Sequence, residues 1–297
     1  MKIVLGTRGS SLARTQTGTI ADLLRANGHD VELQIIETRG DLELAVTVPE
    51  LGGKGLFTAE LEEAILSGRV DAAVHSLKDL PTQDADGLVL AAIPRREDPR
   101  DALVARKGEK LADLPQGARV GTASLRRKAL LLHARPDLDV VPMRGNVDTR
   151  LAKVDGGEVE AIVVAAAGLK RLRRAGTISE LLDFLPAPAQ GALAVQARAD
   201  RDEVIEALGR LHDAGTATCV QAERSLLHEL EGGCSVPVGA LAKARGDQIE
   251  LHALVASLDG SRVLKSDARG ADPIELGRGV ARRLRAQGAQ EILDALA

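Results

Sequence analysis

The chain has 297 residues, enough for two or three domains of ordinary size, and its 44% hydrophobic and 28% charged residues are typical of a globular protein. Its 39 lysines and arginines against 43 aspartates and glutamates give a net charge of −4, which argues against general binding to nucleic acids or membrane surfaces. With no Trp, no Tyr and only two Phe, aromatic stacking on bases is nearly excluded, and the core must consist of Leu, Val, Ile and Ala.

The sequence shows no sign of export. No apolar run reaches the roughly 18–20 residues of a membrane span, and the first residues pass into a strand rather than a cleavable signal, so we expect a cytoplasmic protein. The two cysteines, Cys219 and Cys234, do not suggest a disulfide framework, and we expect both thiols to be reduced. In an acidic protein, any cationic site must be local.

The N-terminal residues predict a strand followed by a helix. We expect a strand over 2–5, a turn over 6–9, and a helix that Ser10 caps and that ends near Asn27. Arg8 and Ser10 then lie at a strand-to-helix junction, where free backbone N–H groups favour an anion. Alternatively, Arg8 pairs with an acidic residue on the surface.

A second strand is expected over 31–38, before the glycine-rich stretch 51–57. That stretch lacks the Gly-Lys-Ser/Thr ending of a phosphate loop, which argues against a nucleoside triphosphate site. We expect a mobile segment that leads into a helix over 58–67. A buried strand over 70–74 follows, and a further strand is expected over 88–93.

The buried strand over 70–74 delivers His75, Ser76, Lys78 and Asp79 to its C-terminal end, where open α/β sheets place their chemistry. Asp79 follows a lysine and precedes Pro81 by two residues, so we expect its carboxylate to be held in a turn beside a fixed positive charge. An ionised carboxylate there can stabilise a cation. The alternative is that Asp79 only caps a helix or turn.

A second series of strands and helices begins near residue 101, with strands expected over 102–105, 118–121, 140–143 and 160–166. Ser124 is expected to cap a helix whose first turn contains Arg126 and Arg127, where positive charge opposes the helix dipole. Such local conflicts often mark function. A bound anion would resolve this one, whereas the alternative is a solvated face. Arg144 and Arg150 follow the strand over 140–143 in the same way.

Two crossings, over 94–99 and 186–191, suggest that the first domain is discontinuous, and predict an α/β fold with two lobes and a hinged cleft. A small C-terminal α+β domain should contain three strands, over 240–245, 248–258 and 262–269, and a helix from Pro273. The expected domains are domain 1 (1–95 and 192–213), domain 2 (100–187) and domain 3 (214–297).

The two cysteines have different surroundings in the sequence. Cys219 lies in an expected amphipathic helix over 216–230 and is interpreted as a core residue. Cys234 follows two glycines in a loop, which gives its sulfur room for a nucleophilic role or for covalent attachment of a group. The loop alone does not decide this, because no adjacent base is apparent.

Several motifs together resemble the porphobilinogen deaminase (hydroxymethylbilane synthase) family along nearly the whole chain. The motifs are Thr38-Arg39-Gly40-Asp41, Gly52-Gly53-Lys54-Gly55-Leu56-Phe57, Val74-His75-Ser76-Leu77-Lys78-Asp79-Leu80-Pro81, Arg96-Glu97-Asp98-Pro99-Arg100-Asp101, Gly121-Thr122-Ala123-Ser124-Leu125-Arg126-Arg127, Arg144-Gly145-Asn146-Val147, Ala167-Gly168-Leu169-Lys170-Arg171-Leu172 and Glu231-Gly232-Gly233-Cys234.

This resemblance implies a transferase of porphyrin and haem biosynthesis. It would condense four porphobilinogen molecules head to tail, release ammonia at each step, and hydrolyse off linear hydroxymethylbilane. The resemblance also implies two lobes like those of periplasmic solute-binding proteins, a small third domain, and a dipyrromethane cofactor bound through a thioether to Cys234. It implies no metal. We expect a monomer with a small-molecule substrate and neither a nucleic-acid nor a membrane partner.

The resemblance assigns roles residue by residue. Asp79 would be the catalytic carboxylate, hydrogen-bonding pyrrole N–H groups and stabilising the cation left by ammonia. The cofactor would be held by Cys234, Lys78, Ser124, Arg126, Arg127, Arg144, Lys54 and Asp79. The substrate would be held by Arg8, Ser10, Arg144, Arg150, Phe57 and Gln190. Arginine suits this role because each porphobilinogen carries an acetate and a propionate.

The chain departs from the family pattern at several positions, which are Glu50, Gly9, Ser11, the 188–191 crossing, Gln196 and Ala197. None of these changes removes Asp79 or Cys234. Three other interpretations remain: a non-catalytic two-lobe module that binds a small polycarboxylate, a thiol enzyme dependent on Cys234, and an inactive scaffold. A thiol enzyme lacks a convincing partner base, since His228 is six residues from Cys234.

Overall fold

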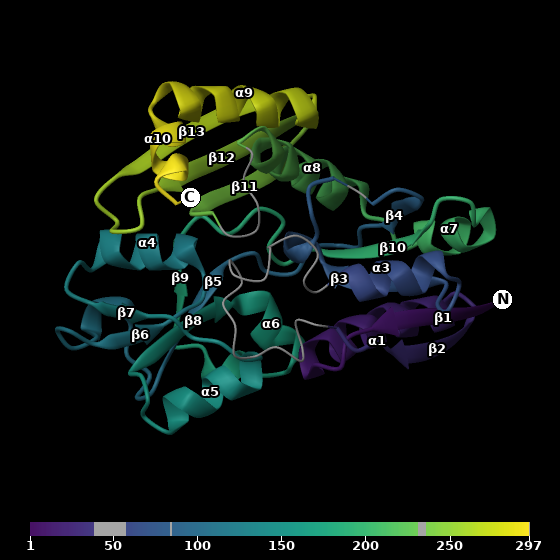
Figure 1. Cartoon of the computed structure of the whole chain (residues 1–297), viewed down its shortest axis with the longest axis horizontal. Coiled ribbons are helices and arrows are strands. Elements are labelled where there is room, and N and C mark those ends of the chain that lie inside the picture. Colours follow the sequence, from purple (N-terminus) through teal and green to yellow (C-terminus); the bar gives the residue numbers. More distant parts are fainter. Residues whose placement is uncertain (39–57, 84, 231–235, 297) are drawn as a thin grey trace. The chain divides into compact units, whose positions relative to one another are not determined.

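A computed structural model describes residues 1–38, 58–83, 85–230 and 236–296 of the chain. It divides into two compact units, Met1–Glu97 with Ala192–Ala217 and Asp98–Gly191 with Thr218–Ala297. Each unit contains a five-stranded α/β sheet, and the second also contains a three-stranded antiparallel sheet (Figure 1). The predicted fold class of two α/β lobes and a small α+β domain is confirmed. The hinge and the domain boundaries stay predictions.

The first unit is built on a sheet with the strand order β2-β1-β3-β10-β4. Its elements are β1 (Lys2–Thr7), α1 (Ser11–Ala26), β2 (Asp30–Ile35), α3 (Ala59–Leu66), β3 (Ala72–Ser76), β4 (Leu88–Ala92), β10 (Leu193–Arg198) and α7 (Asp202–Gly209). β1 runs parallel to β2 and β3, whereas β10 runs antiparallel to β3 and β4. Apolar residues of α1 and α7 form one core with the sheet, and those of α3 form another.

The larger sheet of the second unit follows the same plan, with the order β7-β6-β8-β5-β9. Its elements are β5 (Asp101–Ala105), β6 (Arg119–Gly121), α4 (Leu125–Ala134), β7 (Asp139–Val141), α5 (Val147–Asp155), β8 (Ala161–Ala165), α6 (Ala166–Arg171) and β9 (Glu180–Leu182). In both sheets the strand that follows a crossing, β5 or β10, lies second from the edge and pairs antiparallel. The crossings therefore complete each sheet.

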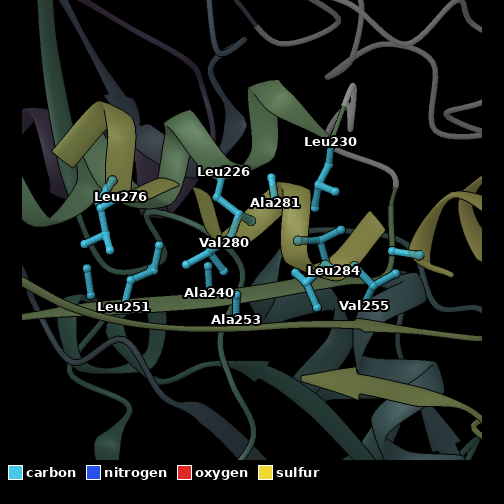
Figure 2. Packing of buried hydrophobic residues seen from close by; sticks show 14 of the residues in the cluster. Leu226, Leu230, Ala240, Leu251, Ala253, Val255, Leu276, Val280, Ala281 and Leu284 are labelled. Carbon is cyan, nitrogen blue, oxygen red and sulfur yellow. The ribbon is translucent and has the colours of Figure 1, made fainter. Parts of the chain in front are cut away.

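The three-stranded sheet carries its helices on one face (Figure 1). Its elements are α8 (Ala214–Glu229), β11 (Val238–Arg245), β12 (Gln248–Ala256), β13 (Val263–Gly270), α9 (Pro273–Ala286) and α10 (Ala289–Asp294). Leu251 and Val255 of β12 point toward Val280 and Leu284 of α9, and Leu226 of α8 closes the same cluster (Figure 2). All five side chains are buried, and this core excludes water without any aromatic residue.

Several local predictions are confirmed. Ser10 caps α1, and its Oγ accepts a hydrogen bond from the Ala13 N–H at 3.3 Å. Ser124 caps α4 in the same way. Cys219 is buried in α8, as expected of a core residue. Across the described residues, no helix is both long and apolar enough to cross a membrane.

The sequence did not predict β9, and most strand boundaries differ from the expected ones by one to three residues. The strand expected over 70–74 is β3, Ala72–Ser76, so His75 and Ser76 belong to the strand itself. β9 has three residues, too few to show an alternation of apolar and polar side chains. β1 continues two residues beyond Leu5, and β2 ends at Ile35 rather than Thr38. The extension of β1 brings Arg8 directly to the end of the sheet, which matters for the site.

Two glycines of α9 provide a test of the packing. A Cβ at Gly277 would lie 2.5 Å from the Ala222 carbonyl oxygen of α8, whereas a Cβ at Gly279 would meet nothing within 4 Å. We predict that Gly277→Ala lowers the free energy of unfolding by about 1–3 kcal/mol, because the backbone of α8 would have to move away from the added methyl group. Gly279→Ala should raise it by about 1 kcal/mol through helix propensity. Urea unfolding of both proteins measures this, and equal effects would contradict close α8–α9 packing.

Candidate active site

The first unit gathers polar residues at the carboxyl edge of two parallel strands. β1 and β3 pair in parallel, with Gly6 opposite Ala73, so Arg8 and His75 lie at the same level two residues farther on. Ser76 is fixed from α1, because the Gln16 Nε2 donates a hydrogen bond to its Oγ at 2.9 Å. Two elements distant in sequence thus form one edge, as the sequence predicted for open α/β sheets.

Asp79 lies at the end of this edge, in the short 3₁₀ turn Leu77–Asp79. The turn is anchored by Leu77, which is buried and whose N–H donates to the Ala192 carbonyl at 3.0 Å. Lys78 is half-buried, but Asp79 is exposed. Within the described part of the chain, the Asp79 carboxylate accepts no hydrogen bond, so it does not act as a cap there. The carboxylate is therefore available to a ligand.

His75, just below this turn, is buried against Gln196 of β10. Burial, with a smaller effect of the nearby charge of Arg8, lowers the pKa of His75 to about 4, and the Gln196 side chain opposes this only in part. In the described structure neither His75 Nε2 nor Gln196 Oε1 makes a well-formed hydrogen bond. His75 is thus a neutral imidazole at pH 7, unsuited to supply a cation to the site.

In the second unit, Arg126 and Arg127 both point inward onto Asp101 at the start of β5. Arg126 Nη1 lies 2.7 Å from Asp101 Oδ2, and Arg127 Nε lies 2.9 Å from Oδ1. The two arginines are 2% and 5% exposed and the aspartate 0%, so the solvated-face alternative is wrong. An internal carboxylate compensates the positive charge in the first turn of α4.

Burial alone would raise the pKa of Asp101, but the charges of Arg126 and Arg127 outweigh it and hold the pKa well below its usual range. Gln190, which is also fully buried, completes the group. Its Nε2 donates to Asp101 Oδ1 at 2.9 Å and to the Pro99 carbonyl at 2.7 Å, and its Oε1 accepts from Arg127 at 3.1 Å. The described hydrogen bonds of this amide are therefore all internal.

Arg150 of α5 adds a third cation to this region. Its Nε donates to the Gly145 carbonyl at 2.9 Å, and no carboxylate of the described chain forms an ion pair with it. Burial lowers the pKa of Arg150, and the charge of Arg127 lowers it further. Arg126 and Arg127 share Asp101, whereas the half-buried positive charge of Arg150 has no described carboxylate partner and attracts an anion. Arg144, at the end of β7, is half-buried nearby in sequence.

Three predicted site residues, Lys54, Phe57 and Cys234, lie outside the described residues. Among the described ones, the first unit collects Arg8, Ser10, Lys78 and Asp79 at one sheet edge. The second unit collects Arg126, Arg127 and Gln190 around Asp101. Ser124 caps the helix that carries the two arginines, and Arg150 lies close enough to Arg127 to feel its charge. No group of three or more His, Cys, Asp or Glu in the described chain could hold a metal ion.

Sequence reasoning missed Asp101. Its signal was present, because two consecutive arginines in the first turn of a helix require a nearby negative charge, and Asp101 opens the strand after the first crossing. Only the folded structure shows that this carboxylate reaches the two arginines of α4.

Family models and relatives of known proteins match this chain over nearly its whole length. The family model "Porphobilinogen deaminase, dipyromethane cofactor binding domain" matches residues 3–206, and "Porphobilinogen deaminase, C-terminal domain" matches residues 217–286. Porphobilinogen deaminase of Brevibacillus brevis is 48% identical over 295 residues, covering 97% of this chain and 96% of the relative. That of Desulforudis audaxviator is 50% identical over 299 residues, covering 98% and 97%.

Solved structures give weaker likenesses. The methionine binding protein MetQ has a TM-score of 0.46 and 14% identity, covering 71% of this chain and 89% of its own. A periplasmic binding protein of Salmonella typhimurium, described as having high arginine specificity, has a TM-score of 0.43 and 14% identity, covering 73% and 93%. At these TM-scores the likeness carries no argument about this chain.

The burial of His75 predicts a pH-dependent stability. The unfolded chain takes up a proton near pH 6.5, but folded His75 does so only at a pKa of about 4, so its contribution is lost as pH falls through this interval. We expect the free energy of unfolding to fall by about 2 kcal/mol between pH 7 and pH 5 on account of this residue. Urea titrations at both pH values measure the loss. A His75→Gln protein with the same pH dependence as the parent would contradict this assignment.

Proposed function

Because the chain belongs to the porphobilinogen deaminase family, we propose that it condenses four porphobilinogen molecules head to tail, releasing ammonia at each step, and then hydrolyses off hydroxymethylbilane. The observation that carries the catalytic part of this proposal is Asp79. Its carboxylate is exposed on a turn that buried Leu77 anchors, at the edge where β1 and β3 end.

Asp79 acts on the reacting pyrrole. Loss of ammonia from porphobilinogen leaves a cation conjugated with the ring, and the fixed negative charge of Asp79 stabilises this cation. The same carboxylate accepts a hydrogen bond from the pyrrole N–H, which orients the ring for attack by the next pyrrole. Asp79 suits this role because no described arginine or lysine forms an ion pair with it.

Arg8 and Ser10 bind substrate carboxylates beside Asp79. Arg8 follows the last residue of β1, and Ser10 begins α1, so both lie at a helix N-terminus with a partial positive charge. A substrate acetate or propionate placed here presents the pyrrole ring to the sheet edge. Lys78, adjacent to Asp79 in the turn, lies on the same edge and contributes a further positive charge to the cofactor.

The second unit fits a dipyrromethane cofactor because half-buried Arg150 adds a positive charge beside Arg127. Arg150 has no described carboxylate partner and lies near Arg127, so the carboxylates of a dipyrromethane would relieve the repulsion. We propose that Arg144 and Arg150 bind these groups directly, with Lys54 and Phe57 contributing from outside the described residues. When bound, the dipyrromethane supplies the pyrrole to which the first substrate is joined.

Cys234 is proposed to bind the cofactor through a thioether. Its position after two glycines gives the sulfur room, and the family model over 3–206 is named for the dipyrromethane cofactor. Arg126, Arg127 and Gln190 keep a role in this proposal, but a less direct one. They bind Asp101, carbonyl groups and each other, and so fix the buried ionic group beside which we propose that Ser124 and Arg150 bind the ligand.

We further propose that the enzyme works as a cytoplasmic monomer on a small-molecule substrate, without a nucleic-acid or membrane partner. The net charge of −4 supports the absence of a nucleic-acid or membrane partner, because it disfavours polyanions. The alternative of a non-catalytic module that binds a polycarboxylate differs in one measurable respect, since such a module releases no ammonia.

The first test is Asp79→Asn. The amide cannot supply negative charge to the developing cation, so we expect kcat to fall at least about 100-fold, whereas the fold and the bound cofactor persist. Consumption of porphobilinogen and release of ammonia measure the effect. Asp86→Asn is the matched control, because Asp86 is an exposed carboxylate in the same unit and its loss should leave kcat unchanged. Full turnover by Asp79→Asn would refute the assigned role.

The second test is the intact mass of the purified protein beside that of Cys234→Ala. We expect the parent to exceed its sequence mass by one dipyrromethane and the variant to show its sequence mass alone. Cys219→Ala is the control, because Cys219 is buried in the α8 core and should leave the adduct in place. An adduct that survives Cys234→Ala would place the attachment elsewhere. A parent that gains no adduct and no activity with porphobilinogen would favour the binding module.

A further inference from the structure

Glu223 of α8 is a buried carboxylate that the proposed mechanism does not use. Its side chain is 0% exposed, and each of its oxygens accepts a backbone N–H. Oε2 accepts from Ala189 at 2.6 Å, and Oε1 accepts from Ala242 of β11 at 2.8 Å. A buried carboxylate is costly unless it is hydrogen-bonded, so a residue that persists there must organise the groups it contacts.

The first of these donors, Ala189, lies in the segment 185–191. This segment consists of the second crossing, 186–191, and Leu185 before it. The segment is held along its length by donors from several elements. The Leu185 carbonyl accepts from Arg126 Nη1 at 2.8 Å, the Pro186 carbonyl from the Ala240 N–H at 2.8 Å, and the Gly191 carbonyl from Arg171 Nη2 at 2.8 Å. Glu223 holds the segment from the other side of the peptide group, because its carboxylate accepts the N–H of Ala189.

Ala189 requires such a partner because its backbone is strained. Its φ of +61° lies in the left-handed region, which costs a residue with a Cβ about 1–2 kcal/mol. The N–H that points to Glu223 therefore belongs to the residue whose conformation most needs support. The next residue is Gln190, and its amide bonds to Asp101 and Arg127.

We propose that Glu223 is a positioning residue, which holds Ala189 in its left-handed conformation and thereby keeps the Gln190 amide on Arg127 and Asp101. This inference rests on the proposed function, in which the arginine cluster of the second unit binds carboxylates. Without Glu223, residue 189 relaxes, Gln190 shifts, and Arg127 and its neighbour Arg150 lose their fixed geometry. Asp79 is on another segment of chain, so its chemistry is spared.

The test begins with Glu223→Gln, which preserves shape but turns an NH₂ group toward one of the two backbone N–H donors. We expect the KM for porphobilinogen to rise about tenfold, the effect of roughly one lost hydrogen bond, while kcat stays within about twofold. Hydrogen exchange of the 185–191 amides, followed by mass spectrometry, should become faster. That second readout does not depend on activity.

The decisive experiment combines Ala189→Gly with Glu223→Gln in one protein. Glycine adopts positive φ without strain, so the double variant should recover both the parental KM and slow exchange. Ala187→Gly is the matched control, because this residue lies in the same segment but not in the left-handed region, and it should recover neither. Gln190→Ala should raise KM by itself, and Glu223→Gln should not raise it further if both act on one contact.

Two results would overturn the inference: a normal KM and normal exchange in Glu223→Gln, or equal recovery by glycine at 187 and at 189. If Glu223→Gln does not fold, Gln190→Ala replaces it as the test variant. Its KM for porphobilinogen should be raised, and an unchanged KM would refute the proposal. Failure of the proposed function looks different, since the parent protein itself would bind no dipyrromethane and release no ammonia.

Discussion

The second unit depends on one buried ionic group, Asp101 between Arg126 and Arg127. Removing one partner from a buried ion pair leaves an uncompensated charge, typically at a cost of about 3–5 kcal/mol, so the three residues must remain together. Their assembly has a structural consequence, because Asp101 begins the strand after one crossing and Gln190 lies just before the strand after the other. The Gln190 amide, which donates to Asp101 and to the Pro99 carbonyl, therefore joins the two crossings beside this ionic group.

The charge balance of this group explains how an acidic protein can present a cationic site. Arg126 and Arg127 pair with Asp101, whereas the neighbouring Arg150 forms no ion pair with a described carboxylate and is half-buried, where water screens its charge poorly. A polycarboxylate ligand is attracted to such a place and not to the acidic surface in general. The internal ion pair also holds the arginines in one geometry, so that less side-chain entropy is lost when a ligand binds.

The sequence predicted the parts of this structure that depend on local chemistry. Ser10 and Ser124 cap helices because a hydroxyl after a strand satisfies the free N–H groups, and this can be read from neighbouring residues. The partner of Arg126 could not be read in this way, since it lies 25 residues earlier and reaches α4 only through the order of the sheet. Glu223 gave a signal that was missed: it occupies the apolar stripe of α8 with Cys219 and Leu226, where a charged residue requires buried partners.

Asp79 and Asp101 show how the fold gives one residue type two opposite tasks. Asp101 is buried and neutralised by arginines, so its charge is already committed to the protein and can respond little to a ligand. Asp79 is exposed on an anchored turn and forms no described ion pair, so its charge is available when a cation forms on a substrate. Stabilising a transient cation requires a charge that is fixed in place beforehand and not yet compensated. Of the two aspartates, only Asp79 meets both conditions, because Leu77 fixes its position while its carboxylate forms no ion pair with a described cation.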